Sequence, residues 1–278
     1  MTSPQITVAL PVFNGQSYIS SAIESVLNQT LQNFELIVVD NFSTDETVKI
    51  VKKFADPRIR LVINQHNLGM IGNWNKAVSL ASGEFIKILS HDDTLSKNCL
   101  EEQLKGFTEN NDKNIGIVTS KKFVINESGQ KIMPGLGLRG QTRIIDGRVA
   151  IRKAIRAGRN VIGEPSVVLV RTNLLREAGE FELPQYTPDI KMWFKILDSS
   201  NLFFLNRTLA SYRLSASSTS MSLAPTQSAD FIRLINDYCK YHPGEIPASI
   251  SKYGAFRSSL NAKLRRKIQQ LGNYSLFK

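Results

Sequence analysis

The first hundred residues alternate short apolar runs with segments of helical periodicity, and this alternation restricts the fold more than any other feature of the chain. Strand, helix and strand recur at short spacing, as in the βαβ units of a mostly parallel sheet. The run FELIVVD is apolar throughout, as expected of a strand buried on both faces. We therefore expect an α/β fold. The predicted strands are 6–12, 34–40, 59–64 and 85–89, and the predicted helices are 17–28, 43–54, 74–81 and 95–104.

Polar side chains follow three of these strands at the point where each one ends. Asn14 follows the first strand, Asp40 ends the second, and Asp92 and Asp93 follow the fourth. Because the carboxyl ends of parallel strands meet at one edge of a sheet, where open α/β folds bind ligands, these side chains should line one crevice. Paired carboxylates are hard oxygen ligands suited to Mg²⁺ or Mn²⁺, which bridge to phosphate. The alternative for the two adjacent carboxylates is that they cap the next helix, since Asp is a favoured N-cap residue.

Length and composition fit one large α/β domain with an extension, and two folded domains are the alternative. The chain has 278 residues, of which 42% are hydrophobic and 21% charged, as is usual for globular proteins. No apolar stretch is long enough to cross a bilayer, and residues 1–10 lack the basic and apolar regions of a secretory signal. We therefore expect a cytoplasmic protein. Cys99 and Cys239 lack zinc-site spacing and should be buried free thiols.

The charge balance favours an anionic partner. Lys and Arg number 35 against 24 Asp and Glu, a net charge of +11, which suits a polyanion or an anionic membrane surface. No helix-turn-helix, zinc-finger or RNP-like pattern accompanies the basic residues, which argues against nucleic acid as partner. No GxGxxG fingerprint or P-loop lysine motif is present, which argues against dinucleotide cofactors and ATP hydrolysis. A nucleotide diphosphate and a membrane leaflet explain the charge equally well.

The patterns weaken beyond residue 105, and two basic helices stand out there. Residues 145–160 predict a basic amphipathic helix. Residues 256–268 place Phe256, Leu260, Leu264 and Ile268 at spacings of four among basic residues, a face that lies on an anionic leaflet or packs on the protein's own core. The other predicted elements are strands at 115–119, 122–125, 166–170, 202–205 and 209–213, a Gly-rich hairpin or loop at 126–140, and helices from Asp189 onward, at 225–241 and at 249–270.

Four segments resemble a family 2 glycosyltransferase of the GT-A type. They are LPVFNG (10–15), SAIESVLNQTLQNFELIVVDNFSTD (21–45), NLGMIGNWNKAVSLASGEFIKILSHDD (67–93) and YTPDIKMWFKIL (186–197). The resemblance is close over the first hundred residues and loose over the next hundred. It implies a GT-A domain over residues 1–222, with a nucleotide-binding half (1–105) and an acceptor half (106–222), followed by a helical extension over 223–278.

The resemblance also implies a reaction, in which a sugar moves from a nucleotide donor, a UDP-sugar by preference, to a hydroxyl group with inversion at the anomeric carbon. The implied cofactor is Mn²⁺ or Mg²⁺. The implied role is the assembly of surface polysaccharide or lipid-linked oligosaccharide, so the acceptor is a saccharide or a lipid-linked saccharide. Such an enzyme is expected in the cytoplasm or attached peripherally to the inner face of the membrane.

The same resemblance assigns roles to the residues at the strand ends. Asp40 should accept a hydrogen bond from the nucleotide base, and Asp92 should face the ribose or the diphosphate. Asp93 matches the metal-binding carboxylate, which holds the cation that offsets charge on the departing diphosphate. His91 is either an additional metal ligand or a residue that merely ends the strand. The residues assigned to nucleotide binding are Pro11, Phe13, Asn14, Asp40, Asn67, Gly69, Asn75 and Asp92.

On the acceptor side, Asp189 matches the family's general base, which takes the proton of the attacking hydroxyl. The acidic residue that usually precedes it is replaced by Pro188. Asp189 as a helix cap and Glu164 as the base are the alternatives. Trp193 is expected to pack beneath the acceptor site. Arg213 is expected to contact the diphosphate, with a solvated arginine as the alternative.

Two other functions remain compatible with this fold. A nucleotidyltransferase would carry a Gly-rich loop with basic residues after the first strand, whereas LPVFNGQSY has one Gly and no basic residue. A non-catalytic nucleotide- or sugar-binding relative would keep the fold without the base. The residues favour the glycosyltransferase.

Overall fold

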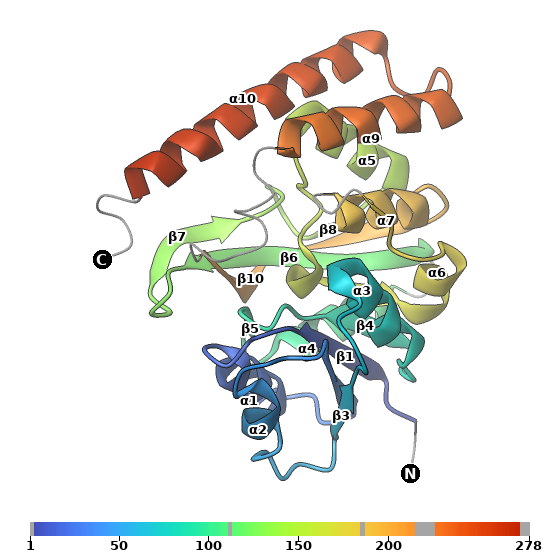
Figure 1. Ribbon diagram of the computed structural model, residues 1–278. Coiled ribbons are helices and arrows are strands. Elements are labelled where there is room, and N and C mark those ends of the chain that lie inside the picture. Colours follow the sequence, from blue (N-terminus) through green and yellow to red (C-terminus); the bar gives the residue numbers. More distant parts are fainter. Residues whose placement is uncertain (1–2, 111–112, 184–186, 215–225, 273–278) are drawn as a thin grey trace.

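One ten-stranded sheet runs through the protein, and helices pack against it (Figure 1). The structure is a computed structural model that describes residues 3–110, 113–183, 187–214 and 226–272. The strand order is β3-β2-β1-β4-β9-β6-β10-β5, with β7 beside β6 and β8 beside β10. The chain has the mixed α/β, mostly parallel architecture that the sequence predicts.

The first half of the sheet consists of four parallel strands whose carboxyl ends lie together. The register places Val12 beside Asp40, and Ala9 beside Ile88. Every residue of β1 is buried, which accounts for its unbroken apolar run. These strands are β1 (Ile6–Val12), β2 (Phe34–Asp40), β3 (Ile59–Ile63) and β4 (Phe85–Ile88).

The helices of this half differ from the predicted ones mainly in where they begin. The helix predicted over 43–54 begins only at Thr47, because the Ser43 hydroxyl accepts a hydrogen bond from the Asn14 amide at 2.9 Å and does not cap the helix. The alternative that Asp92 and Asp93 cap a helix is also wrong, since a two-residue strand intervenes. The elements are α1 (Ile19–Leu27), α2 (Thr47–Val51), α3 (Gly69–Ser79), β5 (Thr94–Leu95) and α4 (Cys99–Thr108), whose N-cap is Asn98.

The second half of the sheet has longer strands than the sequence suggests. Residues 115–119 and 122–125 belong to one strand, and so do 202–205 and 209–213, because irregularities in their mutual register absorb the interruptions in the apolar pattern. The elements are β6 (Ile115–Ile125), β7 (Lys131–Leu136), β8 (Arg143–Ile145), α5 (Gly147–Ala157), a 3₁₀ turn (Pro165–Val167), β9 (Val168–Arg171), α6 (Thr172–Glu177), α7 (Pro188–Leu197) and β10 (Asn201–Arg213).

Buried Lys87 ties β4 to the 3₁₀ turn. Its Nζ donates to the carbonyl oxygens of Ser166 at 3.0 Å and Val168 at 2.9 Å. Burial lowers the pKa of Lys87 to about 8. The tie fixes the turn beside the carboxyl end of β4, where Asp92 and Asp93 follow.

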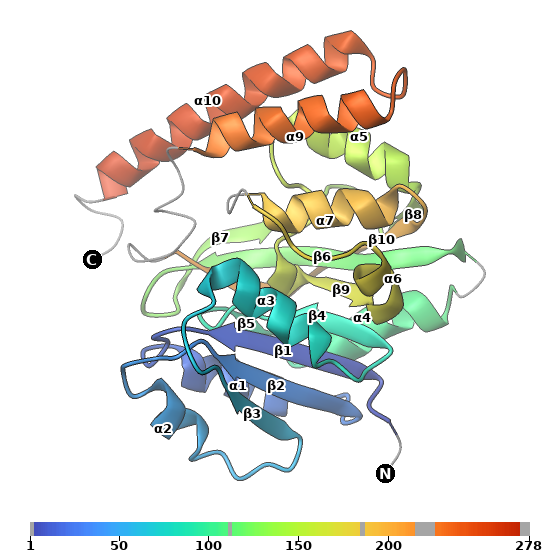
Figure 2. The same ribbon diagram turned by 45° about the vertical axis from the view of Figure 1, so that its right-hand side comes forward.

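Two C-terminal helices, α9 (Gln227–Tyr241) and α10 (Ala248–Gly272), lie on the side of the molecule away from α1 and α2 (Figures 1 and 2). α10 meets α5 through small residues. A Cβ atom on Gly254 would lie 2.1 Å from the Ile155 carbonyl oxygen, so no larger residue fits there. Phe256, Leu260 and Leu264 are exposed, so the alternative that these side chains pack on the protein's own core is wrong. The Ile268 side chain lies outside the described part.

No helix in the described ranges is both long and apolar enough to span a bilayer. The predicted boundary between residues 222 and 223 falls in a segment outside the described residues, so the division into domains stays a prediction. Cys99 and Cys239 are free thiols, the first buried and the second partly exposed.

Candidate active site

Asp40 ends β2 with one carboxylate oxygen lacking a partner. The side chain is 1% exposed, and its Oδ2 accepts a hydrogen bond from the Ser43 amide at 2.9 Å. Its Oδ1 is buried and accepts no hydrogen bond from any described residue. A buried acceptor without a donor costs about 1–3 kcal/mol. The position therefore suits a ligand that brings an N–H group.

The other residues assigned to nucleotide binding mainly shape the loops around Asp40. Asn14 adopts a positive φ of 50°, and its Oδ1 accepts from the Thr44 amide at 2.9 Å. The Asn67 Oδ1 accepts from the Gly69 amide at 2.8 Å. Pro11 is buried, whereas the Phe13 ring is 44% exposed and free to contact a ligand.

Asn75 makes a contact that joins the two halves of the sequence. Its side chain donates to the Phe181 carbonyl at 3.1 Å and accepts from the Phe181 amide at 2.8 Å. The Phe181 ring lies edge-on to Trp74 at 5.3 Å and to Trp193 at 6.5 Å between ring centroids. The side chain of Asn75 thus holds the segment that leads toward α7.

Asp93 is buried beneath the carboxyl end of β4. Its Oδ1 accepts from the Arg213 amide at 3.0 Å, and its Oδ2 accepts from the Ser166 hydroxyl at 2.6 Å. Burial, and next the negative charge of Asp92, hold the pKa of Asp93 well above its usual range, although the two hydrogen bonds and Lys122 act against this. Two adjacent carboxylates in this setting are stabilised by a nearby cation.

The carboxylate oxygens of Asp92 and Asp93 are the type of ligand that a hard divalent cation prefers. Asp92 is partly exposed, whereas Asp93 is 1% exposed with both oxygens already accepting hydrogen bonds. Asp92 is therefore the more accessible ligand, and Asp93 as the principal ligand stays a prediction. The ring of His91 lies against Gly15, where a Cβ atom would approach its Cδ2 to 2.8 Å.

Arg213 holds the turn that carries the two carboxylates. Its Nε donates to the Asp92 carbonyl at 2.9 Å, and its guanidinium lies 4.4 Å from the centroid of the Tyr18 ring. Its Nη1 donates to the carbonyl oxygens of Asn126 and Glu127, each at 2.9 Å. Because Arg213 is 5% exposed, the solvated-arginine alternative is wrong. Its contact with a diphosphate stays a prediction.

Asp189 lies in the first turn of α7, partly exposed. The N-cap of this helix is Thr187, and no side chain caps it. The Asp189 Oδ2 accepts from the Asn160 side chain at 2.8 Å. Partial burial of the carboxylate among its neighbours raises the pKa of Asp189 to about 7, and the negative charge of Glu164 adds to this. Hydrogen bonds from the Ile190 amide and Asn160 oppose the rise. A carboxylate with a pKa near 7 is suited to act as a general base at neutral pH.

Residues 163–166 link the Asp189 side of the site to the Asp93 side. The Gly163 carbonyl accepts from the Trp193 indole at 2.9 Å and from Asn160 at 3.0 Å. Three residues later, Ser166 donates to Asp93. Trp193 is 1% exposed, so it packs under this segment. Hydrogen bonds of this one segment therefore connect the surroundings of two predicted acidic positions that are far apart in sequence.

Glu164, the alternative base, is already engaged. It forms an ion pair with Lys122, whose Nζ lies 4.7 Å from the centroid of the Tyr212 ring. Sequence reasoning missed Lys122, Asn160 and Ser166. Their partners lie on other elements, so no local spacing in the sequence indicates these contacts. The one local signal is near Ser166, where the polar residues of GEPS (163–166) interrupt an apolar run.

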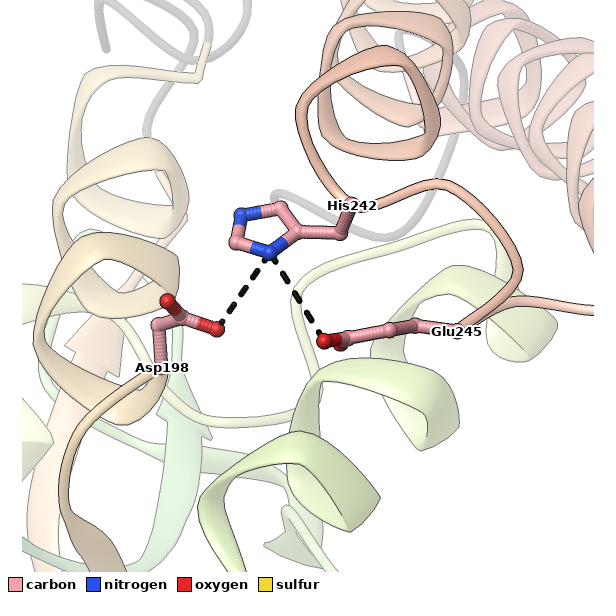
Figure 3. Close-up of side chains that lie close together, drawn as sticks. All are labelled: Asp198, His242 and Glu245. Atoms are coloured by element: carbon pink, nitrogen blue, oxygen red, sulfur yellow. Dashed lines mark ion pairs between the residues drawn. The ribbon is translucent and has the colours of Figure 1, made fainter.

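A second group of titratable side chains lies away from the strand ends (Figure 3). One ligand atom each from Asp198, His242 and Glu245 lies within 4.8 Å of the others. Arg148 already supplies positive charge there, with nitrogens 3.5 Å from Asp198 Oδ1 and 2.7 Å from Glu245 Oε1. Since these residues come from the ends of α7 and α9, the turn after α9 and helix α5, the cluster joins the C-terminal helices to the rest of the protein.

Comparisons with known proteins show which sequences and structures the chain is similar to. The family model described as "Glycosyl transferase family 2" matches residues 7–168. A relative in Escherichia coli, the UDP-Glc:alpha-D-GlcNAc-diphosphoundecaprenol beta-1,3-glucosyltransferase WfgD, is 33% identical over 222 residues, which are 77% of this chain and 79% of that protein.

Two solved structures share the fold. TarS from S. aureus, residues 1–349 in complex with UDP-GlcNAc, superposes with a TM-score of 0.71 at 18% identity, covering 98% of this chain and 76% of that one. The mannosyltransferase PcManGT from Pyrobaculum calidifontis, in complex with GDP-Man and Mn²⁺, gives a TM-score of 0.64 at 15% identity, covering 100% and 83%.

Proposed function

Because the chain belongs to glycosyl transferase family 2 and is a glycosyltransferase of the GT-A fold, we propose that it transfers a sugar from a nucleoside-diphosphate donor to a saccharide hydroxyl, with inversion at the anomeric carbon. The favoured donor is a UDP-sugar. The favoured acceptor is a saccharide carried on a lipid, in the assembly of a surface polysaccharide or a lipid-linked oligosaccharide. We also propose that the protein binds peripherally to the inner face of a membrane.

The observation that carries the proposal is the buried Oδ1 of Asp40, which accepts no hydrogen bond from the described residues. A uracil ring presents an N–H donor that such an acceptor can bind. The exposed ring of Phe13 lies one residue beyond β1, the strand next to β2, and can pack on a base. These two features support a nucleotide whose base carries an N–H group, as uracil does, at the ends of β1 and β2.

Asp189 is the proposed general base. Its pKa of about 7 leaves a substantial deprotonated fraction at neutral pH, yet keeps the carboxylate basic enough to take a proton from a sugar hydroxyl as that oxygen attacks. Asn160 holds the carboxylate through its Oδ2. The second oxygen can then face the acceptor. Attack from this side, opposite the departing diphosphate, is the geometry that inverts the anomeric carbon.

Asp92 and Asp93 are the residues proposed to hold a divalent cation, Mn²⁺ or Mg²⁺. Such an ion, when bound, offsets the negative charge that develops on the departing diphosphate. Arg213 keeps these two carboxylates in place by holding the main chain of Asp92 and the side chain of Asp93. The Mn²⁺ in the PcManGT complex supports the choice of metal.

The donor and acceptor classes draw support from the relatives. The name of the E. coli relative specifies UDP-Glc as donor and a GlcNAc linked to diphosphoundecaprenol as acceptor. TarS was crystallised with UDP-GlcNAc. These names point to a UDP-sugar and, for the acceptor, to a lipid-linked saccharide.

Calorimetric titration tests the proposal directly. UDP is titrated into the protein with and without Mn²⁺, with GDP, CDP and dTDP as controls, on the wild type and on Asp93→Ala. We expect metal-dependent binding of UDP that is at least about tenfold weaker in Asp93→Ala, because the cation loses a carboxylate ligand.

Other outcomes have defined meanings. Preferential binding of another nucleoside diphosphate would replace UDP in the proposal. If no nucleotide binds at any metal concentration, the proposed reaction is wrong for this chain, and a non-catalytic relative of the fold remains.

A further inference from the structure

The excess positive charge of the chain is concentrated in two segments. Residues 147–160 and 248–272 together contain 11 Lys and Arg residues and no Asp or Glu. The remaining residues hold 24 basic and 24 acidic side chains, so they are neutral as a set. The two segments correspond to α5 with the turn after it and to α10, and these helices pack against each other. One region of the structure therefore carries the whole charge imbalance.

α10 exposes four large apolar side chains in the part of the helix whose side chains the structure describes. Its small residues Gly254, Ser258 and Ala262 are buried, and a Cβ atom on Gly158 of the α5 turn would lie 2.4 Å from the Ser258 amide nitrogen. Residues three or four apart lie on one side of a helix, so packing by these small residues turns the bulky ones outward. The outward residues, which form the apolar stripe, are Tyr253, Phe256, Leu260 and Leu264, with exposed fractions of 47%, 63%, 38% and 50%.

Basic residues border the apolar stripe. At about 100° of rotation per residue, Lys252 and Lys263 fall along one border of the stripe and Arg257 along the other. Both lysines are exposed, and the arginine is partly exposed. On α5 and the turn after it, Lys153, Arg156 and Arg159 are also exposed, and no ion pair joins these three to a carboxylate among the described side chains.

The position of α10 leaves this surface accessible. In both ribbon views α10 runs along the outside of the molecule, with α9 and α5 on its inner side (Figures 1 and 2). At 1.5 Å per residue its 25 residues extend over about 37 Å. A surface of this length can lie flat on a planar partner.

We propose that the apolar stripe of α10, with the basic residues of α10 and α5 around it, binds an anionic phospholipid bilayer. The helix lies in the plane of the interface, its apolar side chains enter the boundary between head groups and acyl chains, and its lysines and arginines contact lipid phosphates. Binding itself is independent of the reaction. Its role in presenting a lipid-linked acceptor rests on the proposed function.

Two other partners fit the surface less well. Nucleic acid would satisfy the basic residues but would leave four large apolar side chains in water beside the phosphates. A second copy of the chain would bury the stripe but would bring two surfaces of the same positive charge together. A bilayer with anionic head groups satisfies both the charge and the apolar area.

The test is co-sedimentation of the full chain with vesicles, without any sugar donor. Vesicles of phosphatidylcholine with phosphatidylglycerol are compared with phosphatidylcholine alone, at about 0.1 M and about 1 M salt, between which the Debye length falls from about 10 to about 3 Å. We expect binding to the anionic vesicles that weakens at high salt. Phe256→Glu/Leu260→Glu and, separately, Lys252→Gln/Lys263→Gln should each weaken it about tenfold or more.

Matched variants on the far side of the molecule control for the change in charge and polarity. Ile63→Glu changes a side chain that is 47% exposed on β3, and Lys52→Gln/Lys53→Gln removes two exposed charges after α2. Both should bind vesicles like the wild type, and all variants should keep the wild-type melting temperature to within a few degrees, since every changed residue is exposed.

Several results would overturn the proposal. They are equal binding of the wild type to neutral and anionic vesicles, no binding to either, and undiminished binding by Phe256→Glu/Leu260→Glu. A wild type that is dimeric in light scattering, becomes monomeric in that variant and ignores vesicles would make a second copy the partner. Retention of DNA without vesicle binding would make it nucleic acid. Because nucleotide titration does not involve this surface, failure here leaves the proposed reaction untouched.

Discussion

At the scale of single residues, the environment of Asp189 matters most for the proposed chemistry. Its pKa of about 7 arises chiefly from burial and secondly from the charge of Glu164. A carboxylate with a raised pKa binds a proton in the folded state between about pH 4 and pH 7, where the unfolded chain does not. The folded state therefore loses stability as pH rises through that range. The feature that suits Asp189 to act as a base also destabilises the protein at neutral pH.

Asp189→Asn separates these two effects. Transfer activity should fall about 10²- to 10⁴-fold, because the base is lost. Relative to the wild type, the variant should gain thermal stability progressively between pH 4 and pH 7, because it lacks the carboxylate that is penalised there. The measurements are kcat/KM and the melting temperature over this pH range, and the wild-type kcat/KM should fall below about pH 7.

Glu182→Gln is the matched control. Glu182 is half exposed, and it pairs with Lys191 and Lys195 on the same helix that carries Asp189. Its removal should change activity by less than about threefold, since surface ion pairs contribute about 0–1 kcal/mol. A wild-type activity for Asp189→Asn would remove Asp189 from the role of base.

At the scale of elements, the close contact between α5 and α10 depends on glycine residues at the contact. Gly254 and Gly158 let the two helix backbones approach closely. Glycine within a helix is otherwise unfavourable by about 1 kcal/mol relative to alanine. The glycine in α10 is thus explained by packing and not by local preference.

Gly254→Ala tests this packing through the sign of its effect. Helix propensity alone would make the variant more stable by up to about 1 kcal/mol. We expect it to be less stable by about 1–3 kcal/mol, because the new Cβ would meet the Ile155 carbonyl oxygen at 2.1 Å and force the helices apart. Urea unfolding measures the difference, and a stabilised variant would show that the contact is not tight.

At the scale of the whole molecule, the two halves of the sheet are continuous. β4 of the first half pairs with β9, which pairs with β6 of the second. Asn75 and Ser166 add hydrogen bonds across the same division. Unfolding one half would therefore expose strand edges and core of the other, so the two should unfold together.

Nucleotide binding should consequently stabilise the entire domain. UDP with Mn²⁺ at about 100 times its Kd adds about 2.7 kcal/mol, which corresponds to a few degrees in Tm for a chain of this size. Differential scanning calorimetry should show one transition for the domain, shifted upward as a whole. Asp40→Ala, which lacks the proposed base-binding carboxylate, should show no shift. Two transitions, with the first alone moved by UDP, would contradict the single cooperative unit.

The sequence determined the first half of the fold almost completely. The four apolar runs before residue 90 became four parallel strands, because short apolar runs rich in β-branched residues predict strands from local composition alone. The sequence also predicted the positions of Asp40, Asp92 and Asp93, because each of these residues lies at or just after the end of a predicted strand. Helix starts were less well predicted, as at Thr47 and Cys99, because side chains such as Ser43 bonded to distant segments instead of capping.

Only the tertiary structure decided how these parts combine. Contacts between segments far apart in the chain join Ser166 to Asp93 and Asn160 to Asp189. They also leave one Asp40 oxygen without a hydrogen-bond donor among the described residues. The outward direction of Phe256 and Leu260 was likewise undetermined by sequence. An amphipathic pattern predicts that a helix has an apolar side, but it does not predict the direction in which that side faces. The close fit of Gly254 against α5 turns the apolar side of α10 away from the protein.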